Sequence, residues 1–189
     1  MRPIAYLAAA LALLGCQPLP PAEQVTLTPD VPPGQFAPDP TDQAIIAAQD
    51  VFWNGKGLSG DPARTARATA FIEYLATDFT TLRWLGSPAL VAPQLQLARR
   101  DLRAFLGIAA DAPAQPIITA MLHASDALAS GDRAGAEKML SAAPFRDPPG
   151  TILARLNAMP RLPNVASGAQ MAWVARFLPD DNDNCIFNC

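Results

Sequence analysis

The single histidine of the chain, His123, lies two residues before Ser125 and three residues before Asp126. Residues three apart share a face of a helix, so the imidazole and the carboxylate can pair there. A serine nucleophile also requires an oxyanion hole, and the sequence has no Gly-x-Ser-x-Gly elbow to provide one. We therefore expect a His–Asp pair on a helix surface rather than a catalytic triad.

Carboxylates are the other side chains that can support catalysis, as the general acid and base of a hydrolase. The glutamates are Glu23, Glu73 and Glu137, and most aspartates lie at predicted caps and turns, as Asp61 and Asp132 do. Their spacing neither assigns nor excludes a catalytic pair. We assign no catalytic residue, and a hydrolase that uses carboxylates remains an alternative.

Three further polar clusters lack the features that would make them binding sites. Residues 54–60 are rich in glycine but lack the final Gly-Lys-Ser/Thr of a phosphate-binding loop. A calcium loop of twelve residues beginning within residues 180–184 would run past residue 189. Arg99, Arg100 and Arg103 surround an aspartate on one predicted helix, which is typical of a solvated face. We expect no metal and no cofactor.

The composition argues against a nucleic-acid partner. The chain of 189 residues has 14 Lys+Arg against 17 Asp+Glu and a formal net charge of −3. Proteins that bind nucleic acids usually carry a basic patch or stripe, and here the longest basic run is Arg99-Arg100. The length fits one domain, or one domain with a tail.

Residues 1–16 read MRPIAYLAAALALLGC, with one early arginine before an uncharged, mostly apolar run. Such a run is too short to cross a hydrocarbon core of roughly 30 Å, so it has the properties of a signal peptide. Its end, Leu13-Leu14-Gly15-Cys16, resembles the lipobox of bacterial lipoprotein precursors. The resemblance implies cleavage after residue 15 and acylation of Cys16, which would attach the protein to a lipid bilayer.

The same resemblance implies a location. In Gram-negative lipoproteins an aspartate after the cysteine favours retention in the inner membrane, and this chain has Gln17. We therefore expect the outer membrane, with the domain facing the periplasm. Residues 16–40 are expected to form a semi-rigid tether of polyproline II character that reaches roughly 70 Å, with a short strand at 25–28 as an option. Eight prolines carry this prediction: Pro18, Pro20, Pro21, Pro29, Pro32, Pro33, Pro38 and Pro40.

Once Cys16 is acylated, Cys185 and Cys189 are the remaining cysteines, an even pair in an oxidising compartment. Cysteines four apart come within bonding distance only in a turn or a helix. We predict a Cys185–Cys189 disulfide in an acidic tail, residues 179–189. Two free thiols or a redox pair are the alternatives.

Residues 41–178 show the apolar periodicity of helices and no alternating pattern of a sheet. The sequence predicts an all-α domain, a compact bundle or hairpin array of six to seven helices. Thr41 or Asp42 is expected to cap the first helix, and the second begins after Asp61 and ends near Gly86. The apolar stripes are expected to bury five residues of the second helix and three of the last: Phe71, Ile72, Leu75, Phe79 and Leu82; Met171, Val174 and Phe177.

Residues 121–145 resemble a tetratricopeptide-type helical hairpin. The resemblance lies in Gly131-Asp132 at the turn, in Ala127 and Ala136 where the helices approach, and in Pro144 after the second helix. The family's period of roughly 34 residues does not recur, so an array is not expected.

The sequence combines an anchor, a spacer and a helical domain, and it has no recognisable catalytic constellation. This combination favours a domain that binds or scaffolds another protein of the cell envelope. The alternatives are an envelope hydrolase and a helical carrier of a small apolar ligand. Phe105 is expected to be buried along with the stripe residues. Trp53 and Trp84 lie near predicted helix ends and are candidate interface residues.

Overall fold

The computed structural model describes residues 23–27, 39–56 and 58–177. Within these ranges the chain is all-α, which confirms the predicted fold class, and no strand is present apart from two isolated bridges between loops. The seven α-helices are α1 (Pro40–Ala48), α2 (Pro62–Asp78), α3 (Val91–Leu106), α4 (Ala114–Ala129), α5 (Arg133–Met139), α6 (Pro149–Asn157) and α7 (Pro163–Ala175). A π-helical turn η2 (Gln49–Trp53) continues α1, and a 3-10 turn η3 (Leu82–Trp84) follows α2.

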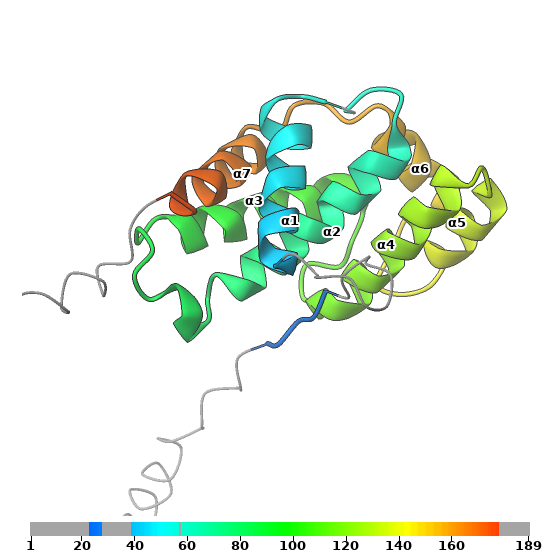
Figure 1. The fold of residues 1–189 in the computed structure, drawn as a ribbon. Coiled ribbons are helices and arrows are strands. Elements are labelled where there is room, and N and C mark those ends of the chain that lie inside the picture. Colours follow the sequence, from blue (N-terminus) through cyan, green and yellow to red (C-terminus); the bar gives the residue numbers. More distant parts are fainter. Residues whose placement is uncertain (1–22, 28–38, 57, 178–189) are drawn as a thin grey trace, which may run out of the picture.

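Helix α2 is the central element, with α1, α3, α4 and α6 packed around it (Figure 1). Twelve of its 17 residues are buried, and many of them are alanines or threonines, whose small side chains let the neighbouring helices approach closely. Helix α7 lies along α3, where a Cβ added at Gly168 would stand 3.1 Å from the Ala98 Cβ. These contacts give a single core that α2 crosses from end to end.

Three predicted helix boundaries are confirmed by their capping geometry. The Asp61 carboxylate accepts a 2.9 Å hydrogen bond from the Arg64 N–H, and Asp132 accepts a 2.8 Å bond from Gly135 at the start of α5. Gly107 ends α3 with φ of 70°, a conformation that residues with a Cβ rarely adopt. Local sequence therefore determines where α2 and α5 begin and where α3 ends.

The predicted end of the second helix was wrong. Helix α2 stops at Asp78, and Leu82 is exposed instead of buried. The Thr80 and Thr81 hydroxyls donate 2.7 Å hydrogen bonds to the carbonyls of Thr77 and Asp78. Such local bonds compete with the helical pattern and end it. The chain therefore leaves the bundle eight residues earlier than the Gly86 signal predicted.

The predicted inward face of the last helix was also wrong. Val174 is exposed and Phe177 is 65% exposed, whereas Val165, Ala169 and Ala172 are buried. The face made of small residues turns inward because it permits the close approach of α7 to α3. Of the other phenylalanines, Phe71 and Phe79 are buried as expected, and Phe105 is half-buried.

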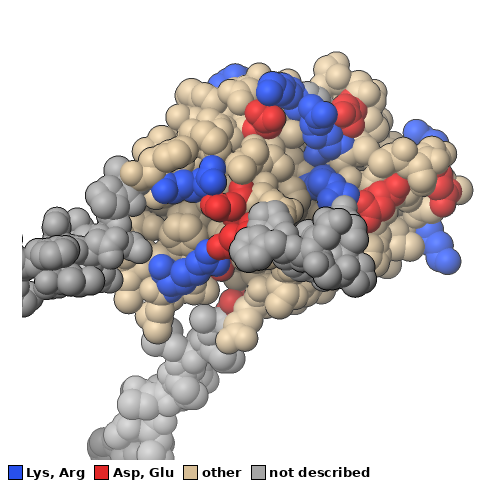
Figure 2. All heavy atoms as spheres, in the orientation of Figure 1, with Lys and Arg blue, Asp and Glu red and all other residues tan. Residues whose placement is uncertain are grey.

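The predicted cap of the first helix was wrong, because Asp39 caps it instead of Thr41 or Asp42. The Asp39 carboxylate accepts a 2.9 Å hydrogen bond from the Thr41 N–H, and Pro40 occupies the first helical position. None of the helices in the described part of the chain has both the length and the apolarity needed to span a bilayer. On the face shown in Figure 2, basic and acidic side chains lie side by side.

Candidate functional site

The most buried charge of the domain is Glu73, on α2, which is 0% exposed. Arg103 of α3, 3% exposed, donates two hydrogen bonds to its carboxylate, from Nε at 2.8 Å and from Nη2 at 2.7 Å. The remaining Nη1 of Arg103 donates to the carbonyls of Ala110 and Ala112, both at 2.8 Å. Arg103 therefore joins α2, α3 and the loop before α4.

Arg99 extends this network to the surface. Its Nε lies 3.0 Å from the second Glu73 oxygen, and its Nη2 lies 3.2 Å from a carboxylate oxygen of Glu23. The other Glu23 oxygen accepts a hydrogen bond from the Ala114 N–H, at the first position of α4. A carboxylate at a helix N-terminus is stabilised by the free N–H groups and by the helix dipole.

The residues after Glu23 also lie on the domain. The Thr26 N–H donates to the side-chain oxygen of Gln115 at 2.7 Å, and the Gln115 amide donates to the Thr26 carbonyl at 3.2 Å. Val25 and Leu27 are half-buried against the core. Residues 25–27 form no strand, so the optional strand in the predicted tether is not seen in its described part.

We call the surface formed by Arg99, Ala114 and Gln115 the segment-binding surface, and residues 23–27 the docked segment. A cavity opens at each end of the docked segment. One, of about 280 Å³, is lined by Leu27 together with side chains of α2 and α4. The other, of about 740 Å³, is lined by Glu23 and side chains of α3 and the loop before α4. The surface that contacts the segment thus continues beyond both of its ends.

The structure corrects the interpretation of the arginine cluster. Only Arg100 has the solvated side chain that was predicted, whereas Arg99 and Arg103 are largely or fully buried. They flank the apolar stripe of α3 and face Glu73 and Glu23, because ion pairing compensates for the loss of hydration. Neither partner glutamate lies near them in the sequence.

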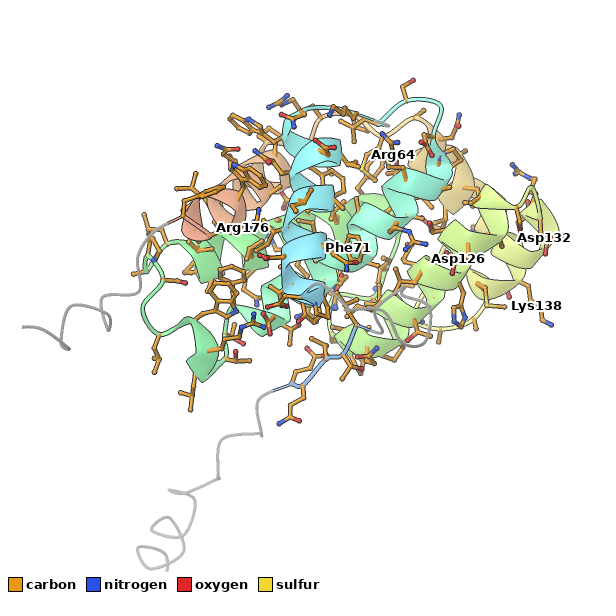
Figure 3. The ribbon with its side chains drawn as sticks, in the orientation of Figure 1. Arg64, Phe71, Asp126, Asp132, Lys138 and Arg176 are labelled. Carbon is orange, nitrogen blue, oxygen red and sulfur yellow. The ribbon has the colours of Figure 1, made fainter. Side chains whose placement is uncertain are left out.

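The triad alternative at His123 finds no support in the geometry. His123 and Asp126 are exposed on α4, whereas Ser125 is buried. Asp126 accepts a hydrogen bond from Arg67 of α2. His123 and Asp126 border the smaller cavity, beside Arg67. Figure 3 shows Asp126 on α4, with Asp132 beyond it at the tip of the α4–α5 hairpin.

A polar cluster holds the start of α1 against the end of α2. The Thr41 hydroxyl lies 2.9 Å from the Tyr74 hydroxyl and accepts a 3.1 Å bond from Arg83, which also pairs with Asp39. Burial raises the pKa of the Tyr74 phenol above its ordinary value of 10.0. Burial disfavours the charge of Asp39, but the Thr41 N–H and Arg83 outweigh it and hold the Asp39 pKa below 3.8.

The two candidate interface tryptophans differ in their surroundings. Trp53 is exposed, and the Arg161 guanidinium lies over its ring at 5.4 Å. Trp84 is half-buried, stacks on Phe79 with ring centroids 3.9 Å apart, and donates a 2.8 Å hydrogen bond to Asp78. The partial exposure fits the expectation for both, and their role at an interface stays a prediction.

Several predicted sites lie outside the described residues: Cys16, the Cys185–Cys189 pair and the acidic run 180–184. Among the residues that are described, no three His, Cys, Asp or Glu side chains are grouped so that they could hold a metal ion. Comparisons of the chain with protein-family models, with curated proteins and with solved structures gave no match.

Proposed function

We propose that this protein is an envelope lipoprotein whose helical domain binds an extended segment of a partner protein at the segment-binding surface. Acylated Cys16 would anchor it in the outer membrane, facing the periplasm. The observation that carries the binding role is the docked segment itself. Its contacts are of the kind that proteins use to hold extended peptides: side-chain bonds to the main chain, a paired carboxylate and apolar anchors.

The chemistry of the docked segment defines the partner that fits. Arg99 and the Ala114 N–H bind a carboxylate, and Gln115 binds the main chain three residues later. Apolar side chains at Val25 and Leu27, two and four residues after the carboxylate, pack on the core. The expected partner segment is therefore extended and acidic, with apolar residues in alternate positions.

The same contacts argue against the hydrolase alternative at this site. Both oxygens of Glu73 are held by arginines, so this carboxylate is not available as a general acid or base. Glu23 is likewise paired with Arg99 and the α4 N-terminus. The network supports binding and positioning rather than proton transfer.

Peptide binding tests the proposed surface. A fluorescent peptide with the sequence of residues 21–29 is titrated into the full mature protein and into its Glu23→Gln variant. The Glu23→Gln change should weaken docking of the protein's own segment, so that the added peptide has less competition for the surface. The affinity for the peptide should then rise by about tenfold, the equivalent of one charge-assisted hydrogen bond. A Gln115→Ala change in the Glu23→Gln background should abolish binding of the added peptide. Equal peptide binding by all three proteins would refute the assignment.

Cross-linking in cells tests whether a protein partner uses this surface. A photoreactive residue at Thr119, exposed one turn after Gln115, should give a product that is lost when Gln115→Ala is added. The matched control is the same residue at Lys138, on α5 at the far end of the domain (Figure 3). A product at both positions, or one that persists in the Gln115→Ala variant, would count against the surface.

The anchor has its own test. Cys16→Ser should abolish palmitate labelling and lipoprotein-type processing, and it should move the protein out of the membrane fraction. Equal labelling of wild type and Cys16→Ser would show that Cys16 is not the acylation site.

A further inference from the structure

The loop between α2 and α3 exposes three leucines within nine residues. Leu82 is 81% exposed, Leu85 is 78% exposed and Leu90 is 70% exposed, more than any other large apolar residue among those described. Single exposed leucines are common on soluble proteins. Three on one loop are a feature that marks an interaction surface.

The loop presents these leucines on an ordered turn. Trp84, between Leu82 and Leu85 in the sequence, turns inward to stack on Phe79 and to bond Asp78. The Leu85 N–H donates to the Leu82 carbonyl at 3.2 Å. The turn is therefore fixed on the domain through its tryptophan, and both leucines face away from it.

The leucines and the docked segment lie at the same end of the domain. Arg99 contacts both the Glu23 carboxylate and, at 3.5 Å, the Thr77 hydroxyl near the end of α2. Leu82 follows Thr77 by five residues. In Figure 1 the docked segment and η3 both lie at the lower edge of the molecule. Glu23, which follows Cys16 in the sequence by seven positions, thus lies at the end that carries the leucines.

The length of that chain sets the distance to the membrane. Glu23 follows Cys16 by seven positions, and seven residues span at most about 25 Å. If Cys16 is acylated, as the proposed function holds, the docked segment keeps this end of the domain within that distance of the bilayer surface. An exposed apolar loop at this end faces the interface directly.

We infer that the α2–α3 loop is a second membrane contact, in which Leu82, Leu85 and Leu90 enter the bilayer interface beside the acyl anchor. A single apolar contact of this size binds a membrane weakly, and an anchor combined with it binds stably. Arg83 and Arg100, both exposed near this end, are placed to contact anionic headgroups. The loop fixes the orientation of the domain and turns the α4–α5 hairpin away from the bilayer.

Tryptophan quenching by brominated lipids tests this contact. The acylated protein carries Trp53→Phe and Trp173→Phe, which leaves Trp84 as the only tryptophan. It is reconstituted in vesicles of phosphatidylethanolamine and phosphatidylglycerol with bromine on the upper acyl carbons. Trp84 emission should be quenched, and Leu82→Ser with Leu85→Ser should reduce the quenching by at least about half. Circular dichroism confirms that this variant remains helical.

The matched control is Ile46→Ser with Val174→Ser, which removes two exposed apolar side chains from α1 and α7. It should leave the quenching unchanged. Vesicle flotation separates the two proposals, because a protein that fails to float refutes the lipid anchor. A protein that floats with Trp84 unquenched refutes the loop contact alone. Cross-linking of the leucine loop to a protein, with Trp84 unquenched, would assign the loop to a protein partner and overturn the inference.

Discussion

Replacing Arg103 by methionine should be among the most destabilising single changes in this domain. Methionine keeps much of the aliphatic volume but removes the guanidinium. Glu73, fully buried, then keeps only Arg99 as a partner, at 3.0 Å. The carbonyls of Ala110 and Ala112 lose the donor that holds them at 2.8 Å. The change leaves a buried carboxylate and two carbonyls incompletely satisfied.

The magnitude follows from these losses. Removing one partner of a buried ion pair typically costs about 3–5 kcal/mol, and the lost bonds to the carbonyls of Ala110 and Ala112 add less, because these residues lie on a partly exposed loop that water can reach. The remaining Arg99 recovers part of this, so the free energy of unfolding should fall by about 4 kcal/mol. For a domain of this size, 1 kcal/mol shifts Tm by about 3–5 °C. The expected loss is therefore about 12–20 °C.

Thermal and urea unfolding, followed by circular dichroism at 222 nm, measure the effect. The matched control is Arg100→Met, which removes a neighbouring guanidinium that is largely exposed, and its effect should stay within about 0.5 kcal/mol. Adding Glu73→Leu to Arg103→Met should recover stability, because it removes the unpaired charge. Equal Tm values for Arg103→Met and Arg100→Met would refute the reasoning.

Three further outcomes are expected. Phe71→Ala should lower the free energy of unfolding by about 3–5 kcal/mol, whereas Phe177→Ala should change it by less than about 1 kcal/mol, in the same urea assay. Because the Tyr74 pKa is raised on folding, its contribution to stability is complete below pH 10 and declines as pH rises through the folded-state pKa. Tyr74→Phe should therefore flatten the alkaline arm of the stability profile, and an unchanged arm would contradict this. Thiol titration of denatured protein should find Cys185 and Cys189 oxidised.

The sequence predicted those parts of the fold that depend on neighbouring residues. Asp61 with Pro62, and Asp132, mark helix starts because their bonds reach only three residues ahead. The end of α2 was missed because threonine hydroxyls, rather than the later Gly86, compete with the helix. A helix end that depends on side-chain competition carries a weak sequence signal.

The candidate site was not predicted, because it depends on contacts between distant residues. Glu73 and Arg103 are 30 positions apart, and Glu23 and Arg99 are 76 apart. One signal was available: Glu73 interrupts a run of apolar residues and alanines, and Arg103 follows Leu102 on an apolar stripe. A charge at such a position needs a buried partner. Gln115 gave no comparable signal, because a lone glutamine on a helix is ordinary.

The docked segment is joined to α1 through residues 28–38, and this short connection has a consequence for competition. A ligand held by a linker of 11 residues has an effective concentration in the millimolar range at its own site. A free segment of equal affinity at micromolar concentration is therefore outcompeted about a thousandfold. Under the proposed binding role, the surface would respond to a segment that binds far more tightly, or to one that confinement on the same membrane raises to a comparable local concentration. Such a surface would discriminate by the proximity of its ligand as well as by its sequence.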